Sequence, residues 1–307
     1  MISRRIVVVG SSNTDMIIRL ERIPRRGETV LGGELLVAAG GKGANQAVGA
    51  ARAGGSVAFV ARVGDDMFGE QAIAGFIKDR IDVKHVYRDH NTPSGVGLIF
   101  IDKGGENSIA VASGANARLS PADVKKASKL FADARVLLVQ LETPLATVQA
   151  AALLAVQSGA RVILNPAPAR QLPDRLLRHV SILTPNQTEA EMLTGIKLKS
   201  TTAVARAASR LRARGAQTVI VTLGARGAFV ADQSGTRIVP GFKVKALDTT
   251  GAGDVFNGAL AVALAEEQPL MQAVRFANAA AAISVTRLGA QLSAPGRGEI
   301  ESLLKRR

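Results

Sequence analysis

The sequence predicts a doubly wound α/β fold, in which helices cover both faces of a mostly parallel sheet, together with a small β-sheet lid. Short runs rich in Val and Ile alternate with helical patterns over most of the 307 residues. These runs are apolar at nearly every position, which is typical of parallel strands buried on both faces. The strict alternation of strand and helix is typical of α/β proteins with a parallel sheet.

The expected elements follow this alternation along the chain. We predict strands at Ile6–Val9, Val57–Val63, Val136–Leu141, Arg161–Asn165, Ile182–Thr184 and Thr218–Thr222. We predict helices at Ala44–Ala53, Gly69–Arg80, Pro121–Phe131, Pro144–Ser158, Thr201–Arg214, Gly253–Glu266 and Leu270–Thr286. No linker rich in Pro, Gly or Ser divides these elements, so we expect a single α/β domain over residues 1–307.

Two segments, Met16–Val37 and Ser94–Val111, interrupt the alternation. Both alternate apolar and polar residues around glycine-containing turns, and neither has a helical pattern. We predict that they form short strand pairs of a separate sheet, inserted at about residues 16–37 and 94–111, which acts as a lid. Lids exclude water from phosphoryl-transfer sites. Two ordinary surface hairpins are the alternative.

Composition excludes several classes of protein. The chain is 47% hydrophobic and has no Cys, which rules out disulfides and thiolate zinc sites. No uninterrupted apolar run reaches the roughly 18 residues of a membrane span. The N-terminal run Ile6–Val9 is too short for a signal peptide. We therefore expect a cytoplasmic protein without a membrane partner.

The net charge of +14 raises the question of nucleic-acid binding. The Lys and Arg residues are spread along the chain, and only one Tyr and no Trp are available to stack on bases. We therefore expect no nucleic-acid partner. The positive charge would instead attract anionic substrates such as ATP.

The most informative motif is Asp248–Asp254 (Asp-Thr-Thr-Gly-Ala-Gly-Asp), which precedes an Ala-rich helical pattern. A small-residue turn at a helix start offers unpaired N–H groups and the positive end of the helix dipole to an anion. A carboxylate there would repel a simple anion, but it can take a proton while the N–H groups hold a phosphoryl group. We predict a phosphoryl-transfer site with Gly251, Ala252 and Gly253 as the anion hole and Asp254 as the base. A helix start with an Asp cap is the alternative.

Two further motifs offer polar groups to a second ligand. Asn13 and Asp15 follow the first strand and could hold vicinal hydroxyls, with an Asx turn or helix cap as the alternative. The octet Gly40–Ala47 places Lys42 and Asn45 beside a glycine turn that can approach a ligand closely, with a simple turn as the alternative. The octet is not a Walker A loop, because its Lys is followed by Gly, and it lacks the third glycine of a dinucleotide fingerprint.

Two junctions after later strands are candidates for contacts with a nucleotide and its metal. Asn186 and Glu189 stand three positions apart at a helix start, where they could hold Mg²⁺ or form a capping box, or do both. Thr222, Gly224 and Gly227 follow a strand and could lie against a nucleotide phosphate or ribose. A hairpin turn is the alternative for this second junction.

Taken together, these residues resemble the ribokinase-like, PfkB-type family of sugar kinases. Two blocks look like the signatures of the family, namely Gly40–Ala47 with Ala51–Gly54, and Asp248–Asp254, and the match runs from Gly10 to Gln291. The resemblance implies ATP-dependent phosphorylation of D-ribose at its 5-hydroxyl. It also implies Mg²⁺, activation by a monovalent cation, usually K⁺, and a homodimer formed through the lid.

The resemblance assigns residues to each ligand. Sugar contacts are implied for Asn13, Asp15, Gly41, Lys42, Asn45, Glu142 and Asp254. Nucleotide contacts are implied for Asn186, Thr222, Gly224, Gly227, Gly253 and Asn278, and Glu189 would organise Mg²⁺ through water. The monovalent cation would lie near Asp248, Thr250, Ser284, Arg287, Gly289 and Ser293, partly held by backbone carbonyls.

Two other functions stay open at this point. A related kinase could act on 2-deoxyribose, a nucleoside or another sugar. A sugar-binding protein without catalytic activity could use the same fold, but the presence of Asp254, Gly253, Asn186 and Glu189 favours an enzyme.

Overall fold

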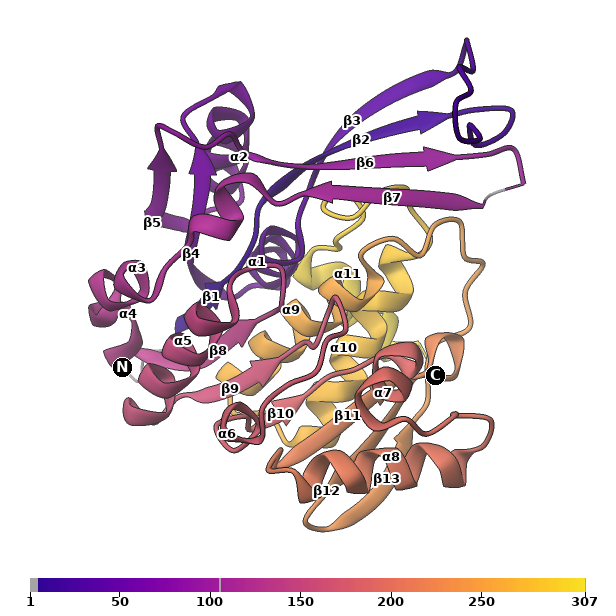
Figure 1. Ribbon diagram of the computed structural model, residues 1–307. Coiled ribbons are helices and arrows are strands. Elements are labelled where there is room, and N and C mark those ends of the chain that lie inside the picture. Colours follow the sequence, from indigo (N-terminus) through magenta and orange to yellow (C-terminus); the bar gives the residue numbers. More distant parts are fainter. Residues whose placement is uncertain (1–4, 105, 307) are drawn as a thin grey trace.

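Two β-sheets organise the chain, and the computed structural model describes residues 5–104 and 106–306 (Figure 1). The larger sheet has nine strands in the spatial order β13 (Gly235–Val239), β12 (Ala228–Asp232), β11 (Thr218–Thr222), β10 (Ile182–Leu183), β9 (Arg161–Leu164), β8 (Ala134–Val139), β1 (Arg5–Val9), β4 (Ser56–Gly64) and β5 (Asp82–Asp89). The smaller sheet has four strands in the order β3 (Glu34–Gly40), β2 (Asn13–Arg19), β6 (Gly95–Ile101) and β7 (Asn107–Ala112).

Helices cover both faces of the larger sheet, which confirms the doubly wound prediction. One face is covered by α3 (Pro121–Lys126), α4 (Ser128–Ala132), α5 (Leu145–Gln157), α6 (Asp174–Leu177), α7 (Gln187–Thr194) and α8 (Thr201–Ala213). The other face is covered by α1 (Lys42–Arg52), α2 (Met67–Lys78), α9 (Ala252–Ala265), α10 (Leu270–Ser284) and α11 (Arg297–Lys305). Along β1, Val7 and Val9 pack on the first face, and Ile6 and Val8 on the second.

The strand order of the larger sheet reverses beside β1. The strands from β11 to β5 pair in parallel, and β12 and β13 add an antiparallel edge. After β1 the chain builds β4 and β5 on one side, and only later β8 on the other side. Ligands of open parallel sheets bind outside the carboxyl ends of the strands at such a reversal. The residues that follow β1 and β8 therefore border the expected crevice.

The smaller sheet extends from the body as a separate layer (Figure 1), and we call it the lid. Strand β2 pairs antiparallel with β3 and parallel with β6, and β6 pairs antiparallel with β7. The prediction of a small sheet from residues 16–37 and 94–111 is confirmed. However, Asn13–Asp15 open β2 instead of forming a turn or helix cap, because Asn13 already pairs with Gly40 and Gly95 on the neighbouring strands.

Other differences from the prediction have local causes. The single helix expected at Pro121–Phe131 is divided at Ala127, whose N–H reaches the carbonyls of Asp123 and Val124 in a tightened turn. The prediction missed β5, which is a half-exposed edge strand with many polar residues, and therefore shows no continuous apolar run. None of the helices in the described ranges combines the length and the apolar character that a membrane crossing requires.

Helices α1 and α9 approach each other closely where their glycines meet. A Cβ atom on Gly258 would lie 2.6 Å from the Ala50 nitrogen and 2.7 Å from the Gln46 carbonyl oxygen. This close approach holds the polar residues of α1 against the first turn of α9.

We expect Gly258→Ala to lower the free energy of unfolding by roughly 1–3 kcal/mol, because the added methyl group overpacks this crossing. Urea denaturation followed by circular dichroism measures the change. The matched control is Gly298→Ala in α11, where nothing lies within 4 Å of the added Cβ atom. Equal stability of the two variants would contradict the packing argument.

Candidate functional site

The Asp248–Asp254 motif forms the turn into α9, as predicted. Gly251 is the N-cap and has a φ of 72°, a conformation that favours glycine. A Cβ atom at this position would also lie 2.7 Å from the Ala290 Cβ atom. Because α9 begins at Ala252, the N–H groups of its first turn, including that of Gly253, point out of the helix end and can receive an anion.

Asp254 is buried in this first turn and receives two hydrogen bonds from α1. Asn45 Nδ2 donates to Oδ2 at 3.0 Å, and Gln46 Nε2 donates to Oδ1 at 2.9 Å. Burial raises the pKa of Asp254, whereas Lys42 and the two amides lower it and Glu142 adds to the rise. A carboxylate with a raised pKa is a stronger base than an exposed one.

Glu142 follows β8 and meets the N-terminus of α1 at the point where the strand order reverses. Its Oε2 accepts hydrogen bonds from Ser11 Oγ at 2.6 Å and from the Lys42 N–H at 2.9 Å. The N-cap residue Gly41 has a φ of 86°, and a Cβ atom there would lie 2.7 Å from the Asn13 nitrogen. The turn before α1 therefore requires glycine so that it can lie against β2.

Electrostatic interactions link the ammonium group of Lys42 to Asp15, Glu142, Glu189 and Asp254, and we call these residues, together with Asn45, the polar cleft. Burial raises the pKa of Asp15 to about 6; Glu142 and Asp254 add to this rise, and Lys42 opposes it. Burial would lower the pKa of Lys42, but Asp254, Glu142, Glu189 and Asp15 outweigh burial and raise it. Lys42 therefore stays charged and balances part of the negative charge in the cleft.

Three polar residues that contact predicted site residues were missed, namely Ser11, Gln46 and Asn116. Asn116 Nδ2 donates to Asn13 Oδ1 at 2.7 Å, and Asn116 Oδ1 accepts from the Ser12 N–H at 2.8 Å. Gln46 stands next to Asn45 in the octet Gly40–Ala47, and this position in the motif is the sequence signal that could have identified it as a site residue. Its contact with Asp254 depends on a residue about two hundred positions away, which no local pattern shows.

A larger cavity of about 430 Å³ begins at the same helix end. Of the residues predicted to contact the nucleotide, it is lined by Thr222, Gly224, Gly227, Gly253 and Asn278. Its apolar walls include Phe242, Val244, Phe256, Ala281 and Val285. The hairpin alternative for the Thr222–Gly227 segment is confirmed, because this turn joins the antiparallel strands β11 and β12.

Asn186 and Glu189 form the capping box of α7. The Glu189 N–H donates to Asn186 Oδ1, and the Asn186 N–H donates to Glu189 Oε2, both at 2.8 Å. Asn186 also forms a β-bridge with Thr222, next to the larger cavity. Burial raises the pKa of Glu189, although the Asn186 N–H and Lys42 oppose the rise. In the described residues, no group of three or more His, Cys, Asp or Glu could by itself hold a metal ion.

The residues expected to surround a monovalent cation lie on two loops that contact each other and at the C-terminal end of α10. Asp248 Oδ2 accepts from the Gly289 N–H at 2.8 Å, and Asp248 Oδ1 accepts from the Thr250 N–H at 2.9 Å. Ser284 is the last residue of α10 and Ser293 lies on the second loop, and both are buried. The Arg287 side chain pairs with Glu299, so that only the backbone of Arg287 could face a cation.

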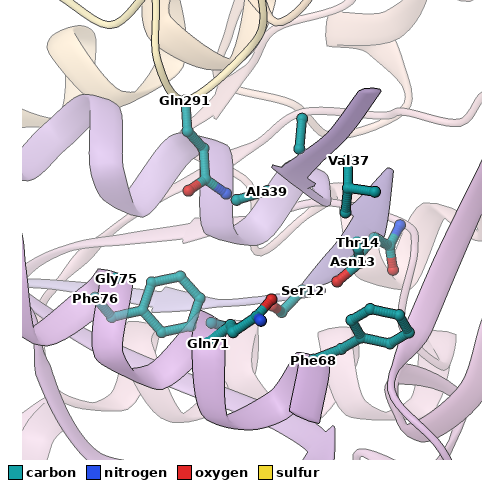
Figure 2. Close-up of a pocket in the computed structure, with 12 residues that line it drawn as sticks. Ser12, Asn13, Thr14, Val37, Ala39, Phe68, Gln71, Gly75, Phe76 and Gln291 are labelled. Atoms are coloured by element: carbon teal, nitrogen blue, oxygen red, sulfur yellow. The ribbon is translucent and has the colours of Figure 1, made fainter. Parts of the chain in front are cut away.

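Figure 2 shows a second, smaller cavity of about 110 Å³ between α2 and the root of the lid. Asn13 lines it together with Gln71 of α2 and Gln291 of the second cation loop. Gln291 Nε2 lies 3.4 Å from the carbonyl oxygen of Gly40, at the end of β3. Neither Asp254 nor Lys42 is among the residues that line this cavity.

The raised pKa of Asp15 predicts a pH-dependent cost in stability. The pKa of Asp15 rises from the usual 3.8 to about 6, so the carboxyl group binds a proton more tightly in the folded protein than in the unfolded chain. The stabilisation that the protonated Asp15 contributes is fully present below about pH 4 and is lost as the pH rises through about 6. We expect wild type to lose roughly 2–3 kcal/mol relative to Asp15→Asn between pH 4 and pH 7. Urea unfolding of both proteins at the two pH values measures this difference, and a constant difference would contradict it.

Comparisons with known proteins show the family and the fold of the chain. The profile of the pfkB family carbohydrate kinases matches residues 3–297. Ribokinase from Haemophilus influenzae is 45% identical over 302 residues, which are 98% of this chain and 99% of the relative. The structure of Thermotoga maritima ribokinase has a TM-score of 0.89 at 40% identity and covers 98% of this chain and 99% of its own. The structure of Arabidopsis thaliana ribokinase complexed with ribose and ATP has a TM-score of 0.92 at 32% identity and covers 100% of both chains.

Proposed function

Because the chain belongs to the pfkB family of carbohydrate kinases, we propose that it phosphorylates D-ribose at the 5-hydroxyl with ATP as the phosphoryl donor. The observation that carries the proposal is the position of Asp254. This buried carboxylate stands in the first turn of a helix whose N–H groups can receive a phosphoryl group, and it faces the polar cleft of Lys42 and Asn45.

The polar cleft is the proposed sugar site. The carboxylates of Asp15 and Glu142 can accept hydrogen bonds from hydroxyl groups, and Lys42 and Asn45 can donate to them. Asn13 and Gly41 complete the site at the start of β2 and of α1. Glu142 follows β8 beside the reversal of strand order and contacts the N-terminus of α1, which is where ligands of open parallel sheets bind.

In the proposed reaction, Asp254 takes the proton of the 5-hydroxyl as that oxygen attacks the γ-phosphorus of ATP. The new P–O bond forms as the bond to the β-phosphate oxygen breaks and ADP leaves. The N–H groups at the Gly251–Gly253 helix end stabilise the negative charge on the transferred group. The raised pKa of Asp254 supports its role, because proton transfer is most efficient when the pKa of the base lies near the working pH.

The larger cavity is the proposed nucleotide site. Its volume of about 430 Å³ lies within the usual range for small-ligand sites. The apolar side chains of Phe242, Val244 and Phe256 suit a purine ring. Thr222, Gly224, Gly227, Gly253 and Asn278 line the same cavity and Asn186 borders it, so that all six are proposed nucleotide contacts.

Two metal ions belong to the proposal. The Glu189 carboxylate lies at a helix start beside the nucleotide cavity, and such hard oxygen ligands suit Mg²⁺ held through water. Bound Mg²⁺ would neutralise phosphate charge. Asp248, Thr250, Ser284, Arg287, Gly289 and Ser293 offer side-chain and backbone oxygens for K⁺ at the C-terminal end of α10 and on two loops joined by the Asp248–Gly289 hydrogen bond. Bound K⁺ would stiffen the turn that leads into the anion hole.

We also propose a homodimer that forms through the lid. Several apolar side chains on the lid strands are exposed, among them Leu35, Leu36, Val37, Ile109 and Val111. Exposed apolar groups in a cluster mark interaction surfaces on soluble proteins. The use of ATP suits a cytoplasmic enzyme, and the proposal includes neither a nucleic-acid nor a membrane partner.

The first test is an ADP-release assay with Mg·ATP on ribose, 2-deoxyribose, fructose, adenosine and uridine. We expect turnover on ribose, and we expect Asp254→Asn to bind ribose and ATP but to lower kcat by a factor of roughly 10² or more. Asp133→Asn, an exposed residue far from the cleft, is the control. Wild-type kcat in Asp254→Asn would show that Asp254 is not the base. Turnover on another acceptor would leave the assignment of Asp254 and the anion hole in place but would show that the proposed substrate is wrong.

A second test concerns the monovalent cation. We expect higher turnover in K⁺ than in a large organic cation, because the proposed oxygen ligands can coordinate a small ion but not a bulky organic cation. The cation should also protect the protein against thermal unfolding, and Ser293→Ala should weaken that protection. Equal activity and equal melting temperatures in both salts would contradict the cation site.

A further inference from the structure

A chain of buried neutral groups leads away from Asp254 beneath the proposed site. Gln46 Nε2 donates to Asp254 Oδ1 at 2.9 Å and also to Asn165 Oδ1 at 3.1 Å. Asn165 stands just beyond β9, and its Nδ2 donates to the carbonyl oxygen of Thr184, just beyond β10, at 3.1 Å. These contacts link α1 to the ends of two central strands.

The chain of hydrogen bonds then returns to the turn from which it began. Thr184 Oγ1 donates to Asn257 Oδ1 at 2.7 Å, and Asn257 Nδ2 donates to the carbonyl oxygen of Gly253 at 2.8 Å. Gly253 precedes Asp254 in the sequence, so the hydrogen bonds close a ring. We call this the amide ring and define it by Gln46, Asn165, Thr184 and Asn257, all of which are buried.

A further amide fixes the direction of Gln46. Gln140 Nε2 donates to Gln46 Oε1 at 2.6 Å. Because the oxygen of the Gln46 amide is thus occupied, its NH₂ group must face Asp254 and Asn165. Gln140 lies just beyond β8 and is buried as well. Gln140, at the end of β8, therefore sets the orientation of the Gln46 amide that donates to Asp254.

We propose that Gln46 is a positioning residue for Asp254, and that the amide ring fixes the carboxylate of the base relative to the Gly251–Gly253 turn. The inference rests on the proposed function, in which Asp254 takes the proton of the sugar hydroxyl. A buried network with all its members satisfied is rigid and favours one arrangement. A rigid ring would hold the base within reach of the hydroxyl in every turnover.

The neutrality of the ring matters for the chemistry. The charged groups that face Asp254 are Lys42, which lowers its pKa, and Glu142, with Asp15 and Glu189 farther along the same cleft. A second cation at the position of Gln46 would hold the carboxylate as firmly, but it would lower the proton affinity of the base. Neutral amides orient the carboxylate and leave much of its basicity intact.

The test compares the pH profile of kcat in wild type and in Gln46→Met, which keeps the chain length but removes the donor. We expect kcat at neutral pH to fall about tenfold, and the acid limb to move up by about one pH unit, because the carboxylate loses a charge-assisted hydrogen bond. The KM for ribose should change less than about threefold, since Asn45, Lys42 and Glu142 stay in place. An unchanged acid limb and kcat would overturn the proposal.

A matched pair of variants tests the ring beyond Gln46, and it serves also if Gln46→Met fails to fold. Thr184→Val removes the ring hydroxyl, and Thr147→Val removes an equally buried hydroxyl that donates to the Leu119 carbonyl oxygen outside the ring. Both should lower the melting temperature, but only Thr184→Val should lower kcat, by about threefold or more. Equal kcat in the two variants would overturn the role of the ring.

Failure of this inference can be distinguished from failure of the proposed function. If wild type does not turn over ribose, the proposed function is wrong. If Asp254→Asn turns over ribose at the wild-type rate, Asp254 is not the base and the positioning role of the ring falls with that assignment, although ribose phosphorylation stands. If Asp254→Asn is inactive while Gln46→Met and Thr184→Val have the kcat of wild type, Asp254 is still supported as the base, but the positioning role of the ring is wrong.

Discussion

The burial of one carboxylate between two helices is the constraint on which the proposed site depends. A charged group that leaves water is costly unless hydrogen bonds replace its hydration. Asp254 meets this requirement through Asn45 and Gln46, which α1 can supply only because it crosses α9 at Gly258 without an intervening side chain. The same contact that packs two helices therefore also orients and tunes the candidate base.

The topology of the sheet brings the other groups to this carboxylate. Asp15, Lys42 and Glu142 come from distant parts of the chain: Asp15 lies in β2, Lys42 begins α1, and Glu142 follows β8 and accepts a hydrogen bond from the Lys42 N–H. Burial raises the pKa values of Asp15 and Asp254, Lys42 opposes both rises, and the neighbouring carboxylates in turn keep Lys42 protonated. The cleft is one electrostatic unit, and no member can be assigned a role from its own surroundings alone.

Much of the fold could be predicted because its signals are local. Continuous apolar runs identified the buried strands, and the glycine-rich turn before Asp254 identified the start of α9. The edge strand β5 was not predicted, because it is partly exposed to solvent and therefore has no continuous apolar run. The pair Asn186 and Glu189 forms the capping box that the sequence predicted as one alternative, and Asn186 also bridges to Thr222 beside the cavity proposed for the nucleotide. Gln46 was overlooked because its partners, Asp254, Gln140 and Asn165, are remote in the sequence.

By itself, the sequence determined the alternation of strands and helices, the separate lid segments, and the turn that presents N–H groups beside Asp254, because hydrophobic period, glycine position and helix starts depend on near neighbours. Only the tertiary structure decided that β2 pairs in parallel with β6, that Asp254 is buried, and that Gln46 belongs to a closed ring of amides. These features depend on burial and on contacts between residues far apart in the chain, and both exist only after the helices have packed on the sheet.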